Sequence, residues 1–297
     1  MSVLTQTSSF CLFLNHFYLD HRHLLRFWKD LTPSEQFYLA DQILELDLNS
    51  INKIFKEAQA NKIFEGILER FPNDKISSYS DNVDDGSWKK IGMDAIARNE
   101  VCVLLLSGGQ GTRLGSDKPK ALFDIGLPSK KSLLQIQAEK IKRLESLAGG
   151  VIPWYIMTSE STDHHIRDAL QASQSYGLDP EQIRVFTQGT FPCLSDEGDI
   201  LLEDYNTIAR SPDGNGGVFK ALRKEAVMAD MKRRQLKHVF MYCVDNVLVK
   251  VADPEFLGFC ISREAECGNK VVRRRPGESV GINGLIGESE DCVCVTV

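Results

Sequence analysis

A short glycine-rich loop, Ser107–Arg113, carries the groups best suited to chemistry in this sequence of 297 residues. It reads Ser-Gly-Gly-Gln-Gly-Thr-Arg, with three glycines in four positions and an arginine at its end. Small residues leave backbone N–H groups free to approach a phosphate chain closely, and the arginine adds a permanent, forked positive charge. The loop therefore predicts contacts to phosphate groups, although the glycines alone are equally compatible with an ordinary turn.

The loop matches neither of two common phosphate-binding fingerprints. The pattern Gly-x-x-x-x-Gly-Lys-Ser/Thr of the common P-loop is absent. The dinucleotide-binding pattern needs a third glycine at the position of Leu114, and Gly115 comes one place late. A second basic segment, Lys118-Pro119-Lys120, follows close behind and supplies further cations.

Two further polar residues end apolar segments and have chemistry suited to a nucleotide. The side-chain amide of Gln188 can both donate and accept, so it can recognise the edge of a uracil ring. Asp245 directly follows an apolar run, where an unpaired carboxylate would be costly, and Mg²⁺ commonly binds one or two carboxylates together with substrate phosphates. Taken alone, Gln188 is also compatible with a capping or surface residue, and Asp245 with a cap of the next segment.

Strands and helices alternate along most of the chain, which is typical of a mostly parallel sheet covered on both faces. We expect strands at 101–106, 151–157, 183–187, 239–244 and 270–273. We expect helices at 132–149, 162–174, 221–235 and 253–264. Ligands collect beyond the carboxyl ends of parallel strands, which is where the glycine loop, Gln188 and Asp245 stand. The predicted fold class is therefore α/β and Rossmann-like.

The N-terminal part of the chain predicts helices rather than sheet. Residues 1–22 match no pattern and are expected to be poorly ordered, residues 23–99 form a helical arm and linker, and residues 100–297 form the main domain. Thr32–Glu35 is a capping box with proline at the first helical position. Helical spacing then places Phe37, Ala40 and Leu44 on one face.

Bulk composition excludes several classes of protein. A net charge of −6 does not favour nucleic acid or an anionic membrane as a partner. No stretch of 18 apolar residues exists, so no transmembrane helix is expected. The eight cysteines include no Cys-x-x-Cys and no Cys/His group with zinc spacing, which is typical of reduced thiols in the cytoplasm.

The stretch Leu106–Gln137 resembles the nucleotidyltransferases that make nucleotide sugars, and in detail the eukaryotic UDP-N-acetylglucosamine (UDP-N-acetylhexosamine) pyrophosphorylase family. The long motif Ser-Gly-Gly-Gln-Gly-Thr-Arg-Leu-Gly and the following Pro-Lys carry the resemblance. The segments 186–192, 213–217 and 242–246 match the family pattern in the same order. The chain departs from that pattern at Ser107, where a smaller residue such as Ala is usual, and at Ala121, where Gly is usual.

This resemblance implies a uridylyltransferase that joins UTP and N-acetylglucosamine-1-phosphate to give UDP-N-acetylglucosamine and pyrophosphate. Arg113 and Lys120 are then the catalytic cations, and Asp245 holds Mg²⁺. Gln188 and Gly214 contact the base, and Asn215 contacts the amino sugar. The remaining implied UTP contacts are Leu106, Ser107, Gly108, Gly109, Gln110, Gly111 and Thr112.

The resemblance covers about residues 23–275, and the family is considerably longer than this chain. We therefore expect a fragment, a truncated isoform or an incomplete gene model that is weakly active or inactive. Two alternatives stay open: a related UTP-dependent pyrophosphorylase for another sugar phosphate, and an inactive nucleotide-binding module. The expected partners are UTP and an amino-sugar-1-phosphate, and the sequence makes no prediction of oligomeric state.

Overall fold

The computed structural model describes residues 19–60, 68–78, 86–111, 115, 118–214, 216–272, 275, 277–278, 282–286 and 292–295. By their packing, these residues belong to two compact units. Unit 1 combines residues 1–66 with 190–213, and unit 2 combines residues 67–189 with 214–297. The predicted division at residue 99 differs from this one, because residues 87–97 pack in unit 2 and residues 190–213 pack in unit 1.

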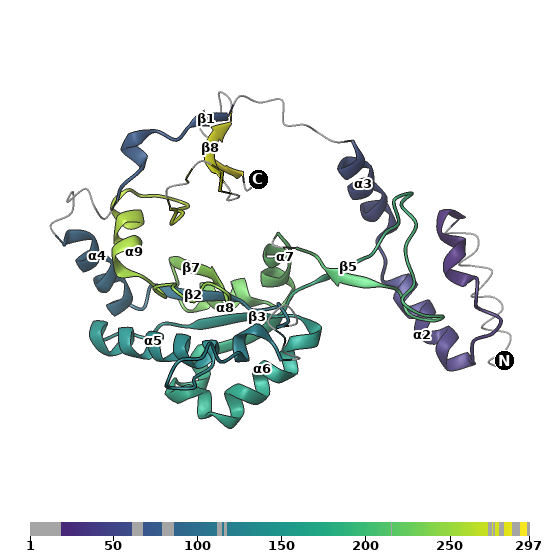
Figure 1. Cartoon of the computed structure of the whole chain (residues 1–297), viewed down its shortest axis with the longest axis horizontal. Helices are drawn as coiled ribbons and strands as arrows, with labels where there is room; N and C mark the ends of the chain where they lie inside the picture. Colours follow the sequence, from purple (N-terminus) through teal and green to yellow (C-terminus); the bar gives the residue numbers. More distant parts are fainter. Residues whose placement is uncertain are drawn as a thin grey trace. The chain divides into compact units, whose positions relative to one another are not determined.

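The centre of unit 2 is a parallel sheet of four strands in the order β4-β3-β2-β7 (Figure 1). The strands are β2 (Val101–Leu106), β3 (Trp154–Thr158), β4 (Ile183–Thr187) and β7 (His238–Cys243). The parallel α/β fold predicted from the alternating pattern is confirmed. The strand predicted at 270–273 is wrong for residues 270–272, which are not in a strand. Val271 and Val272 have strand propensity, but both are exposed and do not pair with a described strand.

Six α-helices of unit 2 surround this sheet. They are α4 (Ser87–Ala97), α5 (Leu133–Ala148), α6 (Glu160–Ala172), α7 (Gly217–Lys224), α8 (Val227–Arg233) and α9 (Pro254–Ser262). Val103 and Leu105 of β2 pack in one apolar core with α4, α5, α6 and α9, whereas Cys102 and Leu104 pack in a second core with α7 and α8. Alternate residues of β2 therefore face opposite layers, as a buried parallel strand requires.

The helix predicted at 221–235 is interrupted. The structure has two helices, α7 and α8, separated at Ala226, which adopts a left-handed backbone conformation with φ of 53°. Arg184 donates to the carbonyl of Glu225 at 2.6 Å, which holds the chain at this break. An alanine gives no sequence signal for such a break, because it is the strongest helix former.

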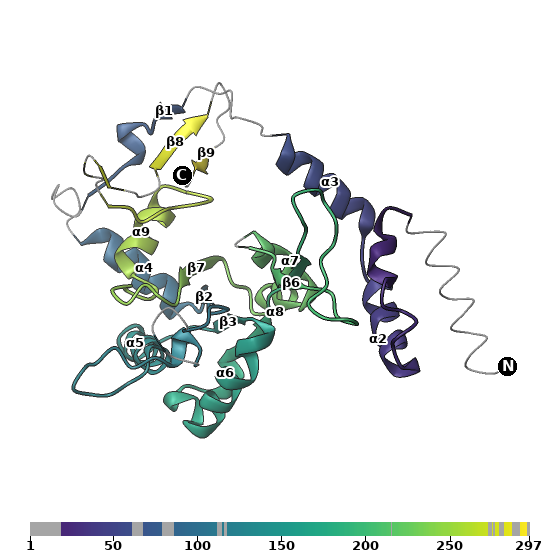
Figure 2. The ribbon, with the colours of Figure 1, turned by 45° about the vertical axis from the view of Figure 1, so that its right-hand side comes forward.

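Shorter elements complete unit 2. Three strands, β1 (Leu68–Arg70), β8 (Ile282–Ile286) and β9 (Cys292–Val295), form an antiparallel sheet in the order β1-β8-β9 (Figure 2). The short helical turns are η2 (Asn73–Lys75), η5 (Lys120–Leu122), η6 (Gln174–Gly177) and η7 (Pro180–Gln182). Helices α4 and α9 lie side by side in both views.

Unit 1 consists of η1 (Leu19–Leu25), α2 (Pro33–Leu44), α3 (Leu48–Gln59) and the antiparallel strands β5 (Thr190–Pro192) and β6 (Arg210–Pro212). The predicted capping box is confirmed, since the Thr32 side chain accepts from Glu35 N and the Glu35 carboxylate accepts from Thr32 N. The predicted helix face is wrong. Phe37 is 75% exposed, and the buried residues of α2 are Leu39, Ala40 and Ile43.

Among the residues that the structure describes, no helix combines the length and apolar character needed to cross a membrane.

Candidate functional site

Two of the predicted site residues, 125 positions apart in sequence, meet at the carboxyl edge of the parallel sheet. Lys120 Nζ donates to Asp245 Oδ2 at 3.3 Å. Lys120 lies in η5, and Asp245 comes two residues after the end of β7. Val244, between that strand and Asp245, donates its N–H to Leu106 O at the end of β2. The Asp245 side chain is 60% exposed and the Lys120 side chain 25%. The pair is therefore accessible to a charged ligand.

Lys120 is also held against the glycine loop. Its N–H donates to Gly109 O at 3.2 Å, and Gly111 N donates to Lys118 O at 3.0 Å. Gln110 and Pro119 form the bridge between these two bonds, so the loop and the Lys-Pro-Lys segment run antiparallel. This pairing fixes the cation of Lys120 beside the loop from which phosphate contacts were predicted.

The Gln188 side chain lies directly over Gly108. A Cβ added to Gly108 would lie 2.8–3.0 Å from the atoms of the Gln188 amide group, so only glycine fits there without moving the amide. Gln188 N donates to Thr158 O at 2.8 Å, which fixes the residue at the end of β4. The structure thus brings together a predicted base contact and a predicted loop residue.

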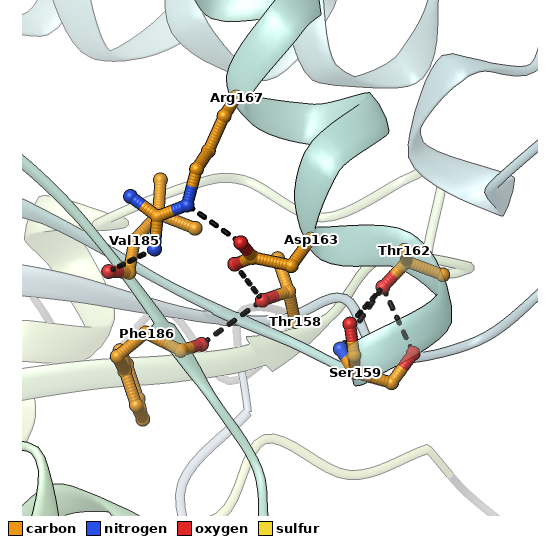
Figure 3. A network of polar contacts seen from close by, with 7 residues as sticks. All are labelled: Thr158, Ser159, Thr162, Asp163, Arg167, Val185 and Phe186. Carbon is orange, nitrogen blue, oxygen red and sulfur yellow. Dashed lines mark hydrogen bonds and ion pairs between the residues drawn. The ribbon is translucent and has the colours of Figure 1, made fainter.

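Side chains at the start of α6 contact the backbone carbonyls of the first residues of the glycine loop. Ser159 Oγ donates to Gly108 O at 2.9 Å, and Thr162 Oγ1 lies 3.4 Å from Ser107 O. Figure 3 shows Ser159 and Thr162 pointing toward each other at the first turn of the helix. Sequence reasoning missed both residues, although Ser-x-x-Thr directly after a strand is a recognisable helix start.

An ion pair next to this turn completes the network in Figure 3. Asp163 accepts from Thr158 Oγ1 at 2.7 Å and from Arg167 Nε at 2.6 Å, and Arg167 also donates to Val185 O at 3.0 Å. Burial alone would raise the pKa of the Asp163 carboxyl, but the hydrogen bonds from Arg167 and Thr158 outweigh it and hold that pKa below its ordinary value. The carboxylate therefore ties α6 to the ends of β3 and β4.

The other predicted site residues divide into placed and unplaced positions. Leu106 ends β2, Ser107 is buried with its hydroxyl unpaired among the described residues, and Gly214 has φ of 78° with open space around it. Thr112, Arg113 and Asn215 lie outside the described residues. The ligand roles predicted for all of these positions stay predictions.

Among the described residues, the arrangement brings the Lys120 cation, the Asp245 carboxylate and the backbone of the glycine loop to a single edge of the sheet. Lysine is a compact point charge suited to phosphate, and the exposed loop residues Gly109 and Gln110 present their backbone to solvent. A carboxylate beside them would repel a phosphate chain unless a cation stands between. The geometry suits an anionic ligand that arrives with a divalent cation.

The sequence pattern of the UTP-glucose-1-phosphate uridylyltransferase family matches residues 48–289. Among similar proteins, UDP-N-acetylhexosamine pyrophosphorylase-like protein 1 of Xenopus tropicalis is 40% identical over 276 residues, which cover 87% of this chain and 54% of that protein. UDP-N-acetylglucosamine diphosphorylase 1 of Arabidopsis thaliana is 42% identical over 269 residues, covering 86% of this chain and 53% of that protein. The chain thus spans about half the length of the curated relatives it matches.

A solved structure agrees with these sequence matches. The uridine diphosphate N-acetylglucosamine pyrophosphorylase from Trypanosoma brucei, crystallised in complex with an inhibitor, superposes with a TM-score of 0.80 at 27% identity. The similarity covers 99% of this chain and 61% of that one.

Proposed function

We propose that this chain, which belongs to the UTP-glucose-1-phosphate uridylyltransferase family, binds UTP at its glycine loop and serves the transfer of the uridylyl group to N-acetylglucosamine-1-phosphate. The products are UDP-N-acetylglucosamine and pyrophosphate. The observation that carries the proposal is the Lys120–Asp245 pair held beside the glycine loop. The names of the similar proteins support N-acetylglucosamine as the sugar.

The proposed reaction needs positioning and charge neutralisation rather than a covalent intermediate. A phosphate oxygen of the sugar-1-phosphate attacks the α-phosphorus of UTP, and the bond from that phosphorus to the bridging oxygen of the β-phosphate breaks. The electron pair leaves with pyrophosphate. Lys120 and Arg113 stabilise the charge on the phosphates, and the loop N–H groups orient them. Gln188, fixed over Gly108, recognises the uracil edge, with Gly214 beside the base and Asn215 on the amino sugar.

We assign a divalent metal, and specifically Mg²⁺, to Asp245. The donor chemistry fits, because the residue offers one exposed carboxylate and Mg²⁺ usually combines one or two carboxylates with substrate phosphates. Bound there, the ion would neutralise phosphate charge. In the structure the Lys120 ammonium group pairs with the Asp245 carboxylate. Binding of UTP and metal together would therefore free Lys120 to contact the phosphates.

We also assign the chain to the cytoplasm. The assignment rests on the cysteine pattern: Cys102, Cys193, Cys243, Cys260 and Cys267 are all free thiols. Burial raises the pKa of the Cys102 thiol to about 12, so this residue is an unreactive part of the core.

The test is release of pyrophosphate from UTP with a panel of sugar-1-phosphates. We expect turnover with N-acetylglucosamine-1-phosphate to exceed turnover with glucose-1-phosphate. Equal or reversed preference would favour a related pyrophosphorylase for another sugar. UTP binding without turnover on any sugar would favour the nucleotide-binding module, and no UTP binding would overturn the proposal.

A further inference from the structure

Three potential metal ligands meet in unit 1, away from the residues discussed above. His21 and His23 come from η1, and Asp199 comes from the loop between β5 and β6. One ligand atom of each lies within 4.8 Å of the others, and within the described part of the chain no other group of three His, Cys, Asp or Glu residues does so. Asp199 lies far from His21 and His23 in sequence, so the three residues show no local metal-binding spacing.

The ring of His23 is oriented with a free lone pair toward Asp199. Its Nε2 lies 2.7 Å from the carbonyl oxygen of Ile200, which can only accept, so Nε2 carries the proton. In the neutral ring Nδ1 is then an acceptor, and it lies 3.9 Å from Asp199 Oδ1, which is also an acceptor. A cation between the two would satisfy both. Metal-bound histidines commonly donate their other N–H to a backbone carbonyl in this way.

His21 is buried, and the part of the chain that the structure describes offers its ring no hydrogen-bond partner. The residue is only 4% exposed, and neither ring nitrogen forms a hydrogen bond with a described residue. An unsatisfied buried polar group destabilises the folded state. Its ring meets the ring of His23 edge-on, with centroids 5.9 Å apart. A bound metal would use the unpaired nitrogen lone pair.

The loop that carries Asp199 has a fixed conformation. Ser195 Oγ accepts from the N–H groups of Glu197 and Asp199, each at 3.2 Å. Gly198 has φ of 95°, and a Cβ there would lie 2.7 Å from the ring of Phe55 in α3, so the turn packs closely on that helix. Asp199 is therefore presented by a turn that only glycine allows.

A cavity of about 240 Å³ lies beside two of the three ligands. His21 and Asp199 line it together with Asn52 and Lys56 of α3. Glu197 also lines this cavity, which has room for water next to the metal.

We propose that His21, His23 and Asp199 bind a divalent transition metal, with Zn²⁺ as the probe. Two imidazoles and a carboxylate are a ligand set that zinc uses with its fourth position open. Bonds of about 2.0–2.2 Å place tetrahedral donors about 3.4 Å apart, so binding draws the three donors inward by at most about 1.5 Å. The ion would tie η1 to the loop of unit 1. This site is independent of the proposed uridylyl transfer.

Zinc titration calorimetry on the 297-residue chain tests the site. All variants carry His164→Gln and His165→Gln, because these neighbouring helix residues, with ring centroids 3.8 Å apart, could bind metal adventitiously. His23→Gln keeps a donor for the Ile200 carbonyl while removing Nδ1, and Asp199→Asn removes the carboxylate. We expect each to weaken Zn²⁺ binding at least about tenfold. Asp196→Asn, the same charge change in the same loop, is the control and should leave the affinity unchanged.

Cobalt gives a second readout that does not depend on activity. The chain with Co²⁺ should show the strong visible absorption of four-coordinate geometry, and the His23→Gln and Asp199→Asn variants should lose it. Absence of Zn²⁺ binding to the reference chain that carries only His164→Gln and His165→Gln, or unchanged affinity in His23→Gln and Asp199→Asn relative to that reference, would overturn the proposal. An equal loss in Asp196→Asn would also overturn it, since loop charge rather than ligation would then explain the binding.

Discussion

Single residues at the sheet edge show what a sequence can and cannot specify about a site. Gln188, Lys120 and Asp245 were recognisable because each follows an apolar segment or a glycine loop, where a polar side chain needs a reason to be. The sequence does not show that Lys120 and Asp245 pair at 3.3 Å, or that the Gln188 amide rests on Gly108. Such contacts depend on how separate strands align in the sheet, and local sequence patterns do not determine that register.

Asp245→Asn tests the proposed metal ligand. The amide is close in shape and uncharged, so the fold should persist while the affinity for Mg²⁺ with UTP falls. We expect Mg²⁺ to strengthen UTP binding to the parent chain about tenfold more than to the variant, since a charge-assisted contact contributes about 1.5–3 kcal/mol. Calorimetry with and without Mg²⁺ measures this. Asp168→Asn, an exposed change on α6, is the control. The same Mg²⁺ effect in Asp245→Asn would assign that carboxylate a structural role.

At the scale of elements, helix α6 has two roles: it packs against the sheet, and its first turn holds the glycine loop. Its residues Ile166 and Leu170 pack in the core, whereas Ser159 and Thr162 hold the carbonyls of Ser107 and Gly108. The helix was predictable from spacing and its role in positioning the loop was not. For α2 the opposite holds: its cap was predictable, but the buried face was wrong because Leu39 and Ile43 form an equally good stripe.

Ser159→Ala should weaken the support of the loop. The variant loses the bond to Gly108 O and a helix-capping hydroxyl, so we expect a loss of about 0.5–2 kcal/mol in stability. We also expect weaker UTP binding at saturating Mg²⁺. Ser173→Ala at the other end of α6, where the hydroxyl donates to Ala169 O at 2.7 Å, is the matched control. Thermal unfolding measures the first effect in both, and only Ser159→Ala should change UTP affinity. Unchanged UTP affinity there would contradict the positioning role.

Helix α8 is attached to the sheet by a carboxylate with a perturbed pKa. Asp230 accepts from Tyr155 Oη at 2.8 Å and from Arg234 Nε at 2.9 Å, and it also pairs with Arg233. Burial opposes ionisation, but the hydrogen bonds from Arg233, Tyr155 and Arg234 outweigh it and lower the pKa of Asp230 to about 2. The folded state therefore binds the proton less tightly than the unfolded state.

The sign of this shift gives a pH prediction. The contribution of Asp230 to stability is complete above the ordinary pKa of about 4 and is lost as pH falls toward about 2, with a total of about 2 kcal/mol. Asp230→Asn should therefore unfold with a shallower dependence on pH between about 4 and 2. Glu100, whose pKa the bonds from Arg98 and Lys237 lower to about 2, keeps its own slope in both proteins. Urea unfolding across this range measures the difference, and identical slopes would be inconsistent with the shift.

At the scale of the whole molecule, the order of strands and helices predicts the α/β fold, but sequence reasoning placed residues 190–213 in the main domain, whereas they pack in unit 1. Ile200 and Ile208 from this segment join Leu39 and Ile43 of α2 in the core of unit 1. Gln42 donates to Asn206 O at 2.9 Å and accepts from Ile208 N at 3.0 Å. The apolar residues of the segment follow neither helical nor strand spacing, so its pattern predicts only a loop. Long-range packing, rather than local propensity, assigns it to unit 1.

The most direct test of the central claim is calorimetric titration of UTP, in the presence of Mg²⁺, into the parent chain and Lys120→Ala. Because the Lys120 ammonium group is held beside the glycine loop and Asp245, we expect its loss to weaken UTP binding by about tenfold or more. Lys237→Ala, the same change at the opposite edge of the sheet, should bind UTP like the parent chain. Equal UTP affinity in Lys120→Ala and the parent chain would contradict the account.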